Sequence, residues 1–251
     1  MMRFTGKTAL ITGAAGNLGR DLALALAREG ADRLILLDRA EAPLKALCDE
    51  IGPKAEAHPC DIASIADMRR VWAGLDLSTG LDLLATAAGT IGSGTPILEM
   101  DPEEFDRMLA LNVRGTLLAV QLSAAALRLK KGAVVTYGST AGLTGSKALG
   151  PYSATKGAIA LLTRSLALSF AEDGVRVNSV CPGSIESAML ETTFASAGPE
   201  AEARRKAYLA IHPLQRFGKP GEVTEAVLYL ASDAASYSTG VSLPVDGGRL
   251  A

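Results

Sequence analysis

Short apolar runs alternate with longer helical patterns along most of this chain. The runs occupy residues 8–12, 33–38, 54–60, 81–87, 133–137, 175–181 and 241–245, and helical patterns occupy 20–29, 42–51, 64–75, 102–129 and 151–172. Consecutive parallel strands need a crossover connection, so this alternation is typical of a parallel sheet with helices on both faces. We therefore predict an α/β fold in which residues 1–251 form one doubly wound domain around a seven-stranded parallel sheet.

A glycine-rich turn follows the first predicted strand. It reads Gly13-Ala14-Ala15-Gly16-Asn17-Leu18-Gly19 and leads into the first helical pattern. Glycines let a phosphate group approach the backbone, and the free N–H groups of a helix N-terminus attract it. Taken alone, this segment could equally be a plain tight turn, so the residues that follow decide between the two interpretations.

Asp38 ends the next predicted strand, nineteen residues after Gly19. In Rossmann domains, an acidic residue at this place binds the ribose hydroxyls of NAD and repels the 2′-phosphate of NADP. We therefore predict a Rossmann dinucleotide site that prefers NAD. The neighbouring Arg39 weakens this preference, since a guanidinium accepts a phosphate. The alternative is that Asp38 caps the helix that begins near Ala40.

Tyr152 and Lys156 lie four residues apart in the helical pattern that begins at Pro151, so they share one helix face. A nearby ammonium favours the phenolate, and we expect Lys156 to lower the pKa of Tyr152. Ser139 follows the apolar run that ends at Tyr137, and its hydroxyl would lie at the carboxyl edge of the sheet. Two solvated side chains are the alternative interpretation of this pair.

Composition excludes several kinds of partner and site. The net charge is −2 with both signs scattered, so we expect neither nucleic acid nor a membrane surface as a partner. The N-terminus has no signal-peptide pattern, and no uninterrupted apolar run reaches the length of a membrane span. Cys48, Cys60 and Cys181 include no CxxC pair and are typical of reduced thiols, which predicts a cytoplasmic protein without a metal site.

Several motifs occur together in one order, and through them the chain resembles the short-chain dehydrogenase/reductase (SDR) family over essentially its whole length. In chain order, the segments that match are the nucleotide loop at residues 12–19, Asp61-Ile62, Leu111-Asn112-Val113, Ser139, Tyr152, Lys156, Pro182-Gly183 and the closing segments at 232–240 and 245–248. Tyr152 follows Ser139 by thirteen residues and precedes Lys156 by four, which is the family's catalytic spacing.

The resemblance implies an oxidoreductase that transfers a hydride between a nicotinamide cofactor and a secondary alcohol or ketone. Tyr152 would exchange the proton with the substrate oxygen, and Ser139 would orient that oxygen. Lys156 would tune Tyr152 and hold the nicotinamide ribose, while Asn112 would link Lys156 to solvent. The cofactor contacts implied are Gly13, Asn17, Leu18, Gly19, Asp38, Asp61, Ile62, Ala88, Gly89, Tyr152, Lys156, Pro182, Gly183 and Ile185.

Two segments depart from the family pattern. Asn17 stands where the nucleotide loop usually has glycine, and asparagine tolerates a left-handed backbone better than most residues. Thr86-Ala87-Ala88-Gly89 stands where the family has Asn-Asn-Ala-Gly, which removes two side-chain amides. We interpret this as a change in local hydrogen bonding, because the four catalytic positions are intact.

Residues 185–216 are predicted to form a lid over the substrate pocket. Met189 and Phe194 lie on the apolar side of a short amphipathic helix, and we expect them to contact the substrate together with Ser139 and Tyr152. Packing of this apolar side against the body of the protein is the alternative. A small or cyclic secondary alcohol, a polyol, a steroid and a 3-oxoacyl thioester all remain open as substrates.

The alternative to an enzyme is a catalytically silent family member that binds NAD as a sensor or scaffold. Such a protein usually loses the tyrosine or the lysine, and this chain has both. The helical patterns at 109–126 and 158–170 are strongly apolar and leave surface for partners. In the family these helices pair between subunits, so the resemblance implies a homotetramer.

Overall fold

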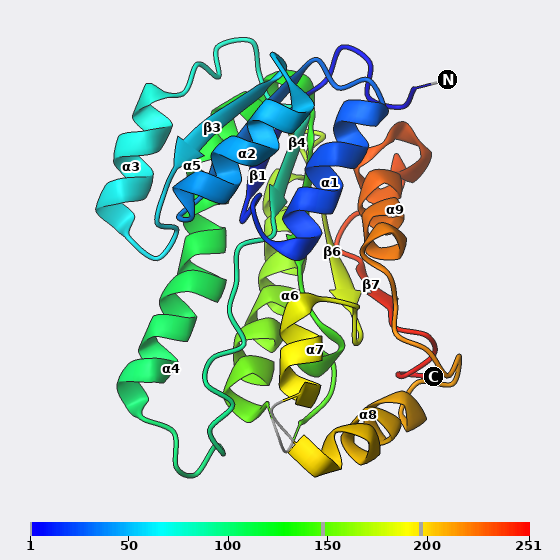
Figure 1. Ribbon diagram of the computed structural model, residues 1–251. Helices are drawn as coiled ribbons and strands as arrows, with labels where there is room; N and C mark the ends of the chain where they lie inside the picture. The colour runs from blue at the N-terminus through cyan, green and yellow to red at the C-terminus, as the bar shows by residue number, and fades with distance from the viewer. Residues whose placement is uncertain (1, 147–148, 196–197) are drawn as a thin grey trace.

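The structure is a computed structural model that describes residues 2–146, 149–195 and 198–251. Its seven strands form one sheet with parallel neighbours in the order β3-β2-β1-β4-β5-β6-β7 (Figure 1). The strands are β1 (Thr8–Thr12), β2 (Arg33–Asp38), β3 (Ala55–Pro59), β4 (Leu83–Thr86), β5 (Ala133–Tyr137), β6 (Arg176–Pro182) and β7 (Ser242–Val245). This confirms the predicted α/β fold.

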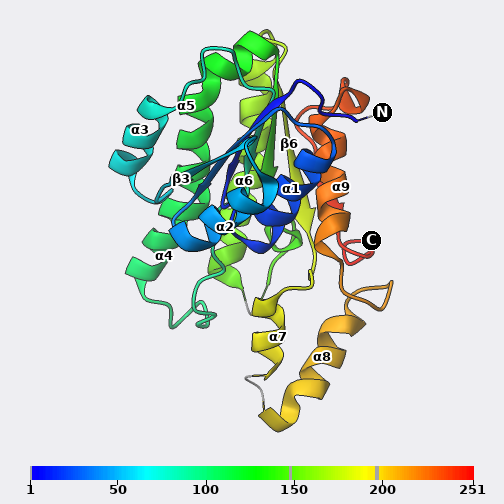
Figure 2. The same cartoon turned by 45° about the horizontal axis from the view of Figure 1, so that its top comes forward.

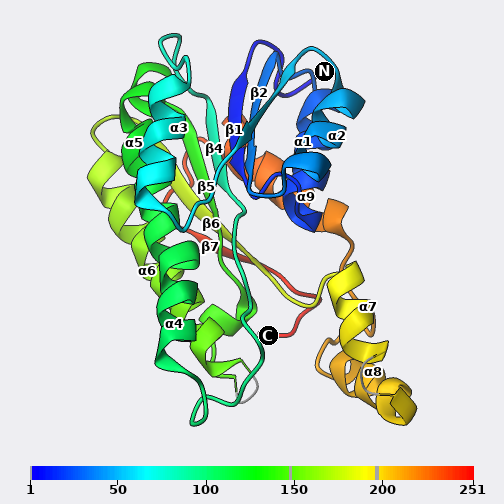
Figure 3. The same cartoon turned by 60° about the vertical axis from the view of Figure 1, so that its left-hand side comes forward.

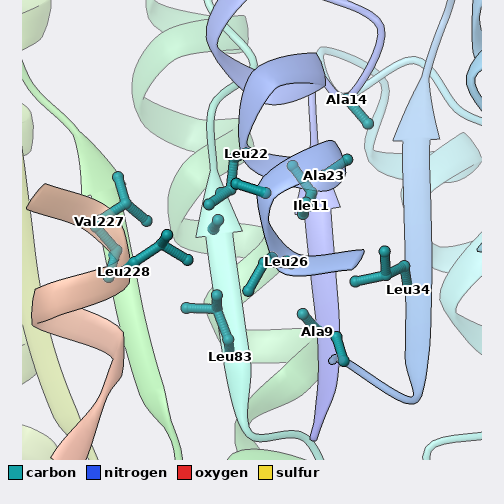
Figure 4. Packing of buried hydrophobic residues seen from close by; sticks show 14 of the residues in the cluster. Ala9, Ile11, Ala14, Leu22, Ala23, Leu26, Leu34, Leu83, Val227 and Leu228 are labelled. Carbon is teal, nitrogen blue, oxygen red and sulfur yellow. The ribbon is translucent and has the colours of Figure 1, made fainter. Parts of the chain in front are cut away.

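Helices cover both faces of the sheet (Figure 3). One face carries α1 (Asn17–Arg28), α2 (Glu41–Ile51) and α9 (Pro220–Ala231), and the other carries α3 (Ile65–Gly74), α5 (Gly115–Lys130) and α6 (Gly150–Phe170). On the first face, Leu22 and Leu26 of α1 and Val227 of α9 meet the side chains of β1 and β4 (Figure 4). Burying an aliphatic side chain of this size stabilises the fold by about 1.5–3 kcal/mol.

Strand β1 pairs with both β2 and β4, so the order of strands reverses at this place. Ligands of doubly wound sheets bind in the crevice outside the carboxyl ends of the strands, at such a reversal. The glycine turn follows β1 and the small-residue turn Ala87-Ala88-Gly89 follows β4. The topology therefore brings both turns to the edge where a ligand is expected.

The helical segment that was expected at residues 102–129 has an interruption. It consists of α4 (Pro102–Leu109), a π-helical turn at Ala110–Arg114 and α5. The sequence shows no uninterrupted apolar run of membrane-spanning length, but the helical segment Pro102–Lys130 is long and apolar enough to cross a membrane by length and composition alone. One such helix is weak evidence, because the core helix of a globular protein passes the same test. Its buried side chains pack against α3 and the sheet.

Segment 185–216 contains two helices, α7 (Ala188–Ala195) and α8 (Ala201–Ala210), which project from the body beyond the carboxyl ends of the strands (Figure 2). Helix α9 follows this segment and has no counterpart among the predicted elements. The sequence contains a start signal for this helix, with Pro220 in the first turn and Glu222 two residues later. In the structure the Glu222 carboxylate accepts the N–H of Lys219 at 2.7 Å.

Candidate active site

Strand β5 and helix α6 bring Ser139, Tyr152 and Lys156 to the carboxyl edge of the sheet. Ser139 follows β5, and its Oγ accepts the N–H of Ala141 at 3.1 Å, which starts a short 3-10 turn. That turn packs directly on α6, since a Cβ on Gly142 would lie 2.4 Å from the carbonyl carbon of Lys156. The close approach fixes the serine relative to the helix that carries the other two residues.

Lys156 is deeply buried, with 6% of its surface exposed. Its Nζ donates a hydrogen bond to the carbonyl oxygen of Tyr137 at 2.6 Å and lies 5.7 Å from the ring centroid of Tyr152. Burial disfavours the ammonium and lowers the pKa of Lys156 to about 8. The amine is therefore held at the end of β5, and its ammonium loses a proton more readily than that of an exposed lysine.

Tyr152 corrects one expectation from the sequence. Burial raises the pKa of its phenol, and a hydrogen bond with the Ser139 hydroxyl offsets only part of that rise. The expected downward shift from Lys156 does not occur here, because desolvation of the phenolate dominates and the ammonium is directed at Tyr137. In this state the tyrosine is a proton donor at neutral pH.

Asn112 lies in the π-helical turn and is almost completely buried. Its Oδ1 accepts the N–H of Thr90 at 2.8 Å, while its Nδ2 donates to the Thr90 carbonyl at 2.9 Å and to the Thr155 hydroxyl at 3.0 Å. The Thr155 hydroxyl in turn donates to the Tyr152 carbonyl at 2.8 Å. Asn112 thus joins the loop after β4 to the first turn of α6. A π-turn at such a residue is common at functional sites.

The glycine turn, called the glycine cradle below, packs tightly on itself and on the turn after β4. Gly13 has φ +68°, and a Cβ there would lie 2.6 Å from the backbone of Ala88. A Cβ on Gly19 would lie 2.1 Å from the carbonyl oxygen of Gly13. Gly89 lies beside the lysine, since its Cβ would lie 3.2 Å from Asn112 Oδ1 and 3.5 Å from Lys156 Nζ. The turns after β1 and β4 therefore touch, and the turn after β4 extends to Lys156.

The predicted adenosine contacts lie at the ends of β2 and β3. The Asp38 carboxylate accepts the N–H of Ala15 at 3.0 Å and that of Ala40 at 2.9 Å, so it ties the glycine turn to the start of α2. Asp61 is exposed, and Oδ1 accepts the N–H of Ala63 at 2.9 Å. Ile62 is buried in the core. Asp38 therefore binds the backbone at the start of α2, which was the alternative interpretation of this residue. It does so at the position where a ribose is expected.

The segment after β6 lies beside this cradle. Pro182 ends β6, and the N–H of Gly183 donates to the Val245 carbonyl at 3.0 Å. Two residues on, Ile185 forms a parallel bridge with Gly218. Neither the N–H nor the carbonyl of Ile185 has a hydrogen-bond partner in the described part of the chain. Both groups are available to a ligand.

Asn17 and Leu18 complete the glycine turn at the start of α1. Asn17 Nδ2 donates to the carbonyl oxygen of Glu186 at 2.9 Å, so the departure from the family's glycine creates a link to segment 185–216. Leu18 is half-buried and packs on the hydrophobic core. Its side chain therefore serves packing, which leaves only its backbone to meet a cofactor.

Phe194 does not have the environment expected of a substrate contact. It is buried, stacks on Phe217 with ring centroids 5.6 Å apart, and meets Tyr208 edge-on at 5.4 Å. Arg205 lies over both phenylalanine rings and pairs with Glu191 at 3.0 Å. Phe194 is thus a packing residue within segment 185–216, which was the alternative. Met189 belongs to α7, but its side chain lies outside the described residues.

Two further residues reach the site without a signal in the sequence. Thr155 precedes the lysine and carries the link between Asn112 and Tyr152. His212 is buried, and its Nε2 lies 3.3 Å from the N–H nitrogen of Ser184. A threonine in a helix and a lone histidine have many uses, so only the three-dimensional contacts single them out.

The comparisons agree with this geometry. A family model described as enoyl-(acyl carrier protein) reductase matches residues 13–249. The 2-(S)-hydroxypropyl-CoM dehydrogenase 3 of Xanthobacter autotrophicus is 38% identical over 99% of this chain and 98% of its own length. A protein of the same organism, inactive 2-(S)-hydroxypropyl-CoM dehydrogenase 2, is 37% identical over 92% of this chain and its own full length.

Among solved structures, levodione reductase superimposes with a TM-score of 0.91 and 30% sequence identity over 98% of both chains. The seven-stranded parallel sheet with helices on both faces agrees with these full-length matches. The chain therefore belongs to the short-chain dehydrogenase/reductase family of oxidoreductases.

Proposed function

We propose that this protein is an NAD-dependent dehydrogenase that interconverts a small secondary alcohol and its ketone. The observation that carries the proposal is the juxtaposition of a half-buried Tyr152 and a buried Lys156 with the glycine cradle at the same sheet edge. Gly89 supports it, because it brings the turn after β4 close to Lys156 Nζ without a side chain of its own. A cofactor and a proton-transfer group would meet there.

The residues present fit a nicotinamide dinucleotide. The open backbone around Gly13 and Gly19 would hold the diphosphate, and Asp38 would bind the adenosine ribose. Lys156 would hold the nicotinamide ribose, and the free N–H and carbonyl of Ile185 suit a carboxamide. When bound, the nicotinamide accepts or supplies the hydride.

The chain's own residues would handle the proton. Tyr152 exchanges it with the substrate oxygen, and the raised pKa favours donation to a ketone. The Ser139 hydroxyl, which is hydrogen-bonded to Tyr152, orients that oxygen. Asn112 holds the loop after β4 against α6, which keeps the tyrosine and the cradle in register. In the oxidation direction Tyr152 must first lose its proton, so oxidation is expected to speed up as the pH rises.

Asp38 supports NAD rather than NADP. A 2′-phosphate would bring negative charge against a carboxylate that already accepts two backbone N–H groups. The names of two similar proteins support the substrate class: one is a dehydrogenase of a hydroxypropyl compound and the other a reductase of a dione. Both names describe chemistry between a hydroxyl-bearing carbon and a carbonyl.

A catalytically silent dinucleotide-binding protein is the second candidate. It is kept because one full-length relative is named as inactive at nearly the same identity as its active neighbour. The Ser139–Tyr152 contact supports the enzyme, since binding of the dinucleotide needs Lys156 but no proton-transfer group.

The test is NADH formation over a panel of secondary alcohols, cyclic alcohols, polyols and hydroxyacyl thioesters, with NADP in parallel. Tyr152→Phe should lower kcat by roughly 10²–10⁴-fold while NADH still binds, because only the proton donor is lost. Tyr237→Phe is the matched control, since Tyr237 is fully exposed. NADH binding without turnover on any substrate would favour the silent protein, and greater efficiency with NADP would contradict the role of Asp38.

A further inference from the structure

His212 joins segment 185–216 to the turn beside the proposed nicotinamide site. It follows α8 and is 1% exposed. Nδ1 lies 2.8 Å from the carbonyl oxygen of Tyr208, and Nε2 lies 3.3 Å from the backbone nitrogen of Ser184. One ring nitrogen therefore contacts the helix, and the other contacts the turn that follows β6.

These two contacts fix the state of the ring. A carbonyl oxygen only accepts, so Nδ1 carries the hydrogen; a backbone N–H only donates, so Nε2 has none. The two contacts therefore assign the Nδ1–H tautomer to His212, in which the Nε2 lone pair accepts the N–H of Ser184.

The Gly183–Ser184 turn is closely packed, and His212 forms one side of that packing. A Cβ on Gly183 would lie 3.0 Å from Asp246 Cα and 3.3 Å from His212 Nε2, so the backbone is held between β7 and the imidazole. The Ser184 carbonyl accepts the N–H of Gly218 at 3.0 Å. On its other side, the ring meets Phe217 edge-on at 6.3 Å. His212 thus connects the aromatic cluster (Phe194, Tyr208, Phe217) to the Gly183–Ser184 backbone through direct contacts.

We propose that His212 is a positioning residue that holds the Gly183–Ser184 turn in the place required by the nicotinamide half of the dinucleotide. The inference rests on the proposed function, because it needs the dinucleotide site to exist. It predicts a specific asymmetry. Loss of the histidine affects ligands that contain the nicotinamide ring and spares ADP-ribose, which keeps the diphosphate and both riboses but lacks that ring.

The first test compares two ligands on three variants. His212→Phe should raise the Kd of NADH by about tenfold, as for one lost hydrogen bond that leaves a buried donor unpaired. The Kd of ADP-ribose, measured by calorimetry, should change less than about twofold. His212→Gln retains an acceptor for Ser184 and should recover most of the NADH affinity. His58→Gln is the matched control, because His58 is on β3 and far from the turn in the sheet order.

A second measurement uses the unaltered protein and does not depend on whether His212→Phe folds. The chain has only two histidines, so long-range ¹H–¹⁵N spectra resolve both rings, and His58→Gln assigns them. His212 should show the Nδ1–H tautomer, and its Nε2 shift should move on addition of NADH but not of ADP-ribose.

The outcomes separate this inference from the proposed function. If neither ligand binds the unaltered protein, the dinucleotide site itself is wrong. If both bind, an Nε2–H tautomer or an equal loss of both affinities in His212→Phe overturns the positioning role alone. Unchanged affinities in that variant overturn it as well.

Discussion

At the scale of single residues, Lys156 is where stability and the proposed chemistry conflict. Its ammonium is removed from water and meets the Tyr137 carbonyl, with no carboxylate partner among the described residues. Such a charge costs free energy, as the lowered pKa of about 8 records. A chain selected for stability alone would place an apolar side chain there. The cost is therefore expected to be recovered in function.

Lys156→Met makes this cost measurable. The pKa of Lys156 falls from its ordinary 10.5 to about 8 on folding, so the unfolded chain binds the extra proton between these values and stability rises with pH across that window. From pH 7.5 to 9.5 this residue should add about 2 kcal/mol to the free energy of unfolding. Urea titrations should show that gain as the difference between the unaltered protein and Lys156→Met, because the raised pKa values of the Cys48, Cys60 and Cys181 thiols act in the opposite direction in both proteins. Lys45→Met, on an exposed helix face, is the control; an equal gain in both variants would contradict the assignment.

The residues that the sequence could predict are those whose spacing alone defines a shared face or edge. Ser139, Tyr152 and Lys156 are of this kind, because a strand end and one helical turn bring them together. The sign of the Tyr152 pKa shift was wrong, since it depends on burial, which spacing does not contain. The packing of Phe194 could not be predicted for the same reason, because its partners Tyr208 and Phe217 come from later in the chain.

At the scale of elements, the strands were predictable because buried parallel strands are continuous apolar runs. The interruption at Ala110–Arg114 was not, since a π-turn needs one extra residue per turn and no special residue type. Its consequence is functional, because the Asn112 side chain reaches both Thr90 and Thr155 from there. The course of segment 185–216 could not be predicted either, because it depends on contacts such as that between Phe194 and Phe217, which follows the segment.

At the same scale, Asn17 connects the start of α1 to segment 185–216. Without this contact, the proposed cofactor would be the connection between these two elements. Asn17→Asp keeps the shape but removes the N–H donor to the Glu186 carbonyl. Because one hydrogen bond contributes about 0.5–1.5 kcal/mol, the Glu186 and Gly218 amides should exchange roughly 3–10 times faster with solvent deuterium. Arg20→Gln, on the same helix, should leave both rates unchanged. Equal rates in Asn17→Asp would mean that the link contributes nothing to the proposed lid.

At the scale of the whole molecule, the outer faces of α5 and α6 carry exposed leucines among polar residues. Leu161 and Leu168 on α6 are 64% and 80% exposed, and Leu129 at the end of α5 is 66% exposed. Leu161 and Leu168 are seven residues apart, so they lie on one face of the helix. An apolar stripe on neighbouring helices is typical of a surface that another subunit covers. We therefore propose the homotetramer that the sequence predicted, with α5 and α6 at the contact.

Charges on this stripe should separate the subunits without unfolding them. Leu161→Glu with Leu168→Glu would bury two carboxylates from each subunit at the contact, a cost that an apolar interface cannot offset. Light scattering at micromolar protein should give about four times the chain mass of 25.9 kDa for the unaltered protein and a lower multiple for the variant. Leu98→Glu is the control, because Leu98 is 96% exposed outside these helices. A monomeric unaltered protein, or a variant that keeps its full mass, would contradict the proposed contact. Since both leucines point away from the sheet, the far-ultraviolet circular dichroism of the variant should match that of the unaltered chain.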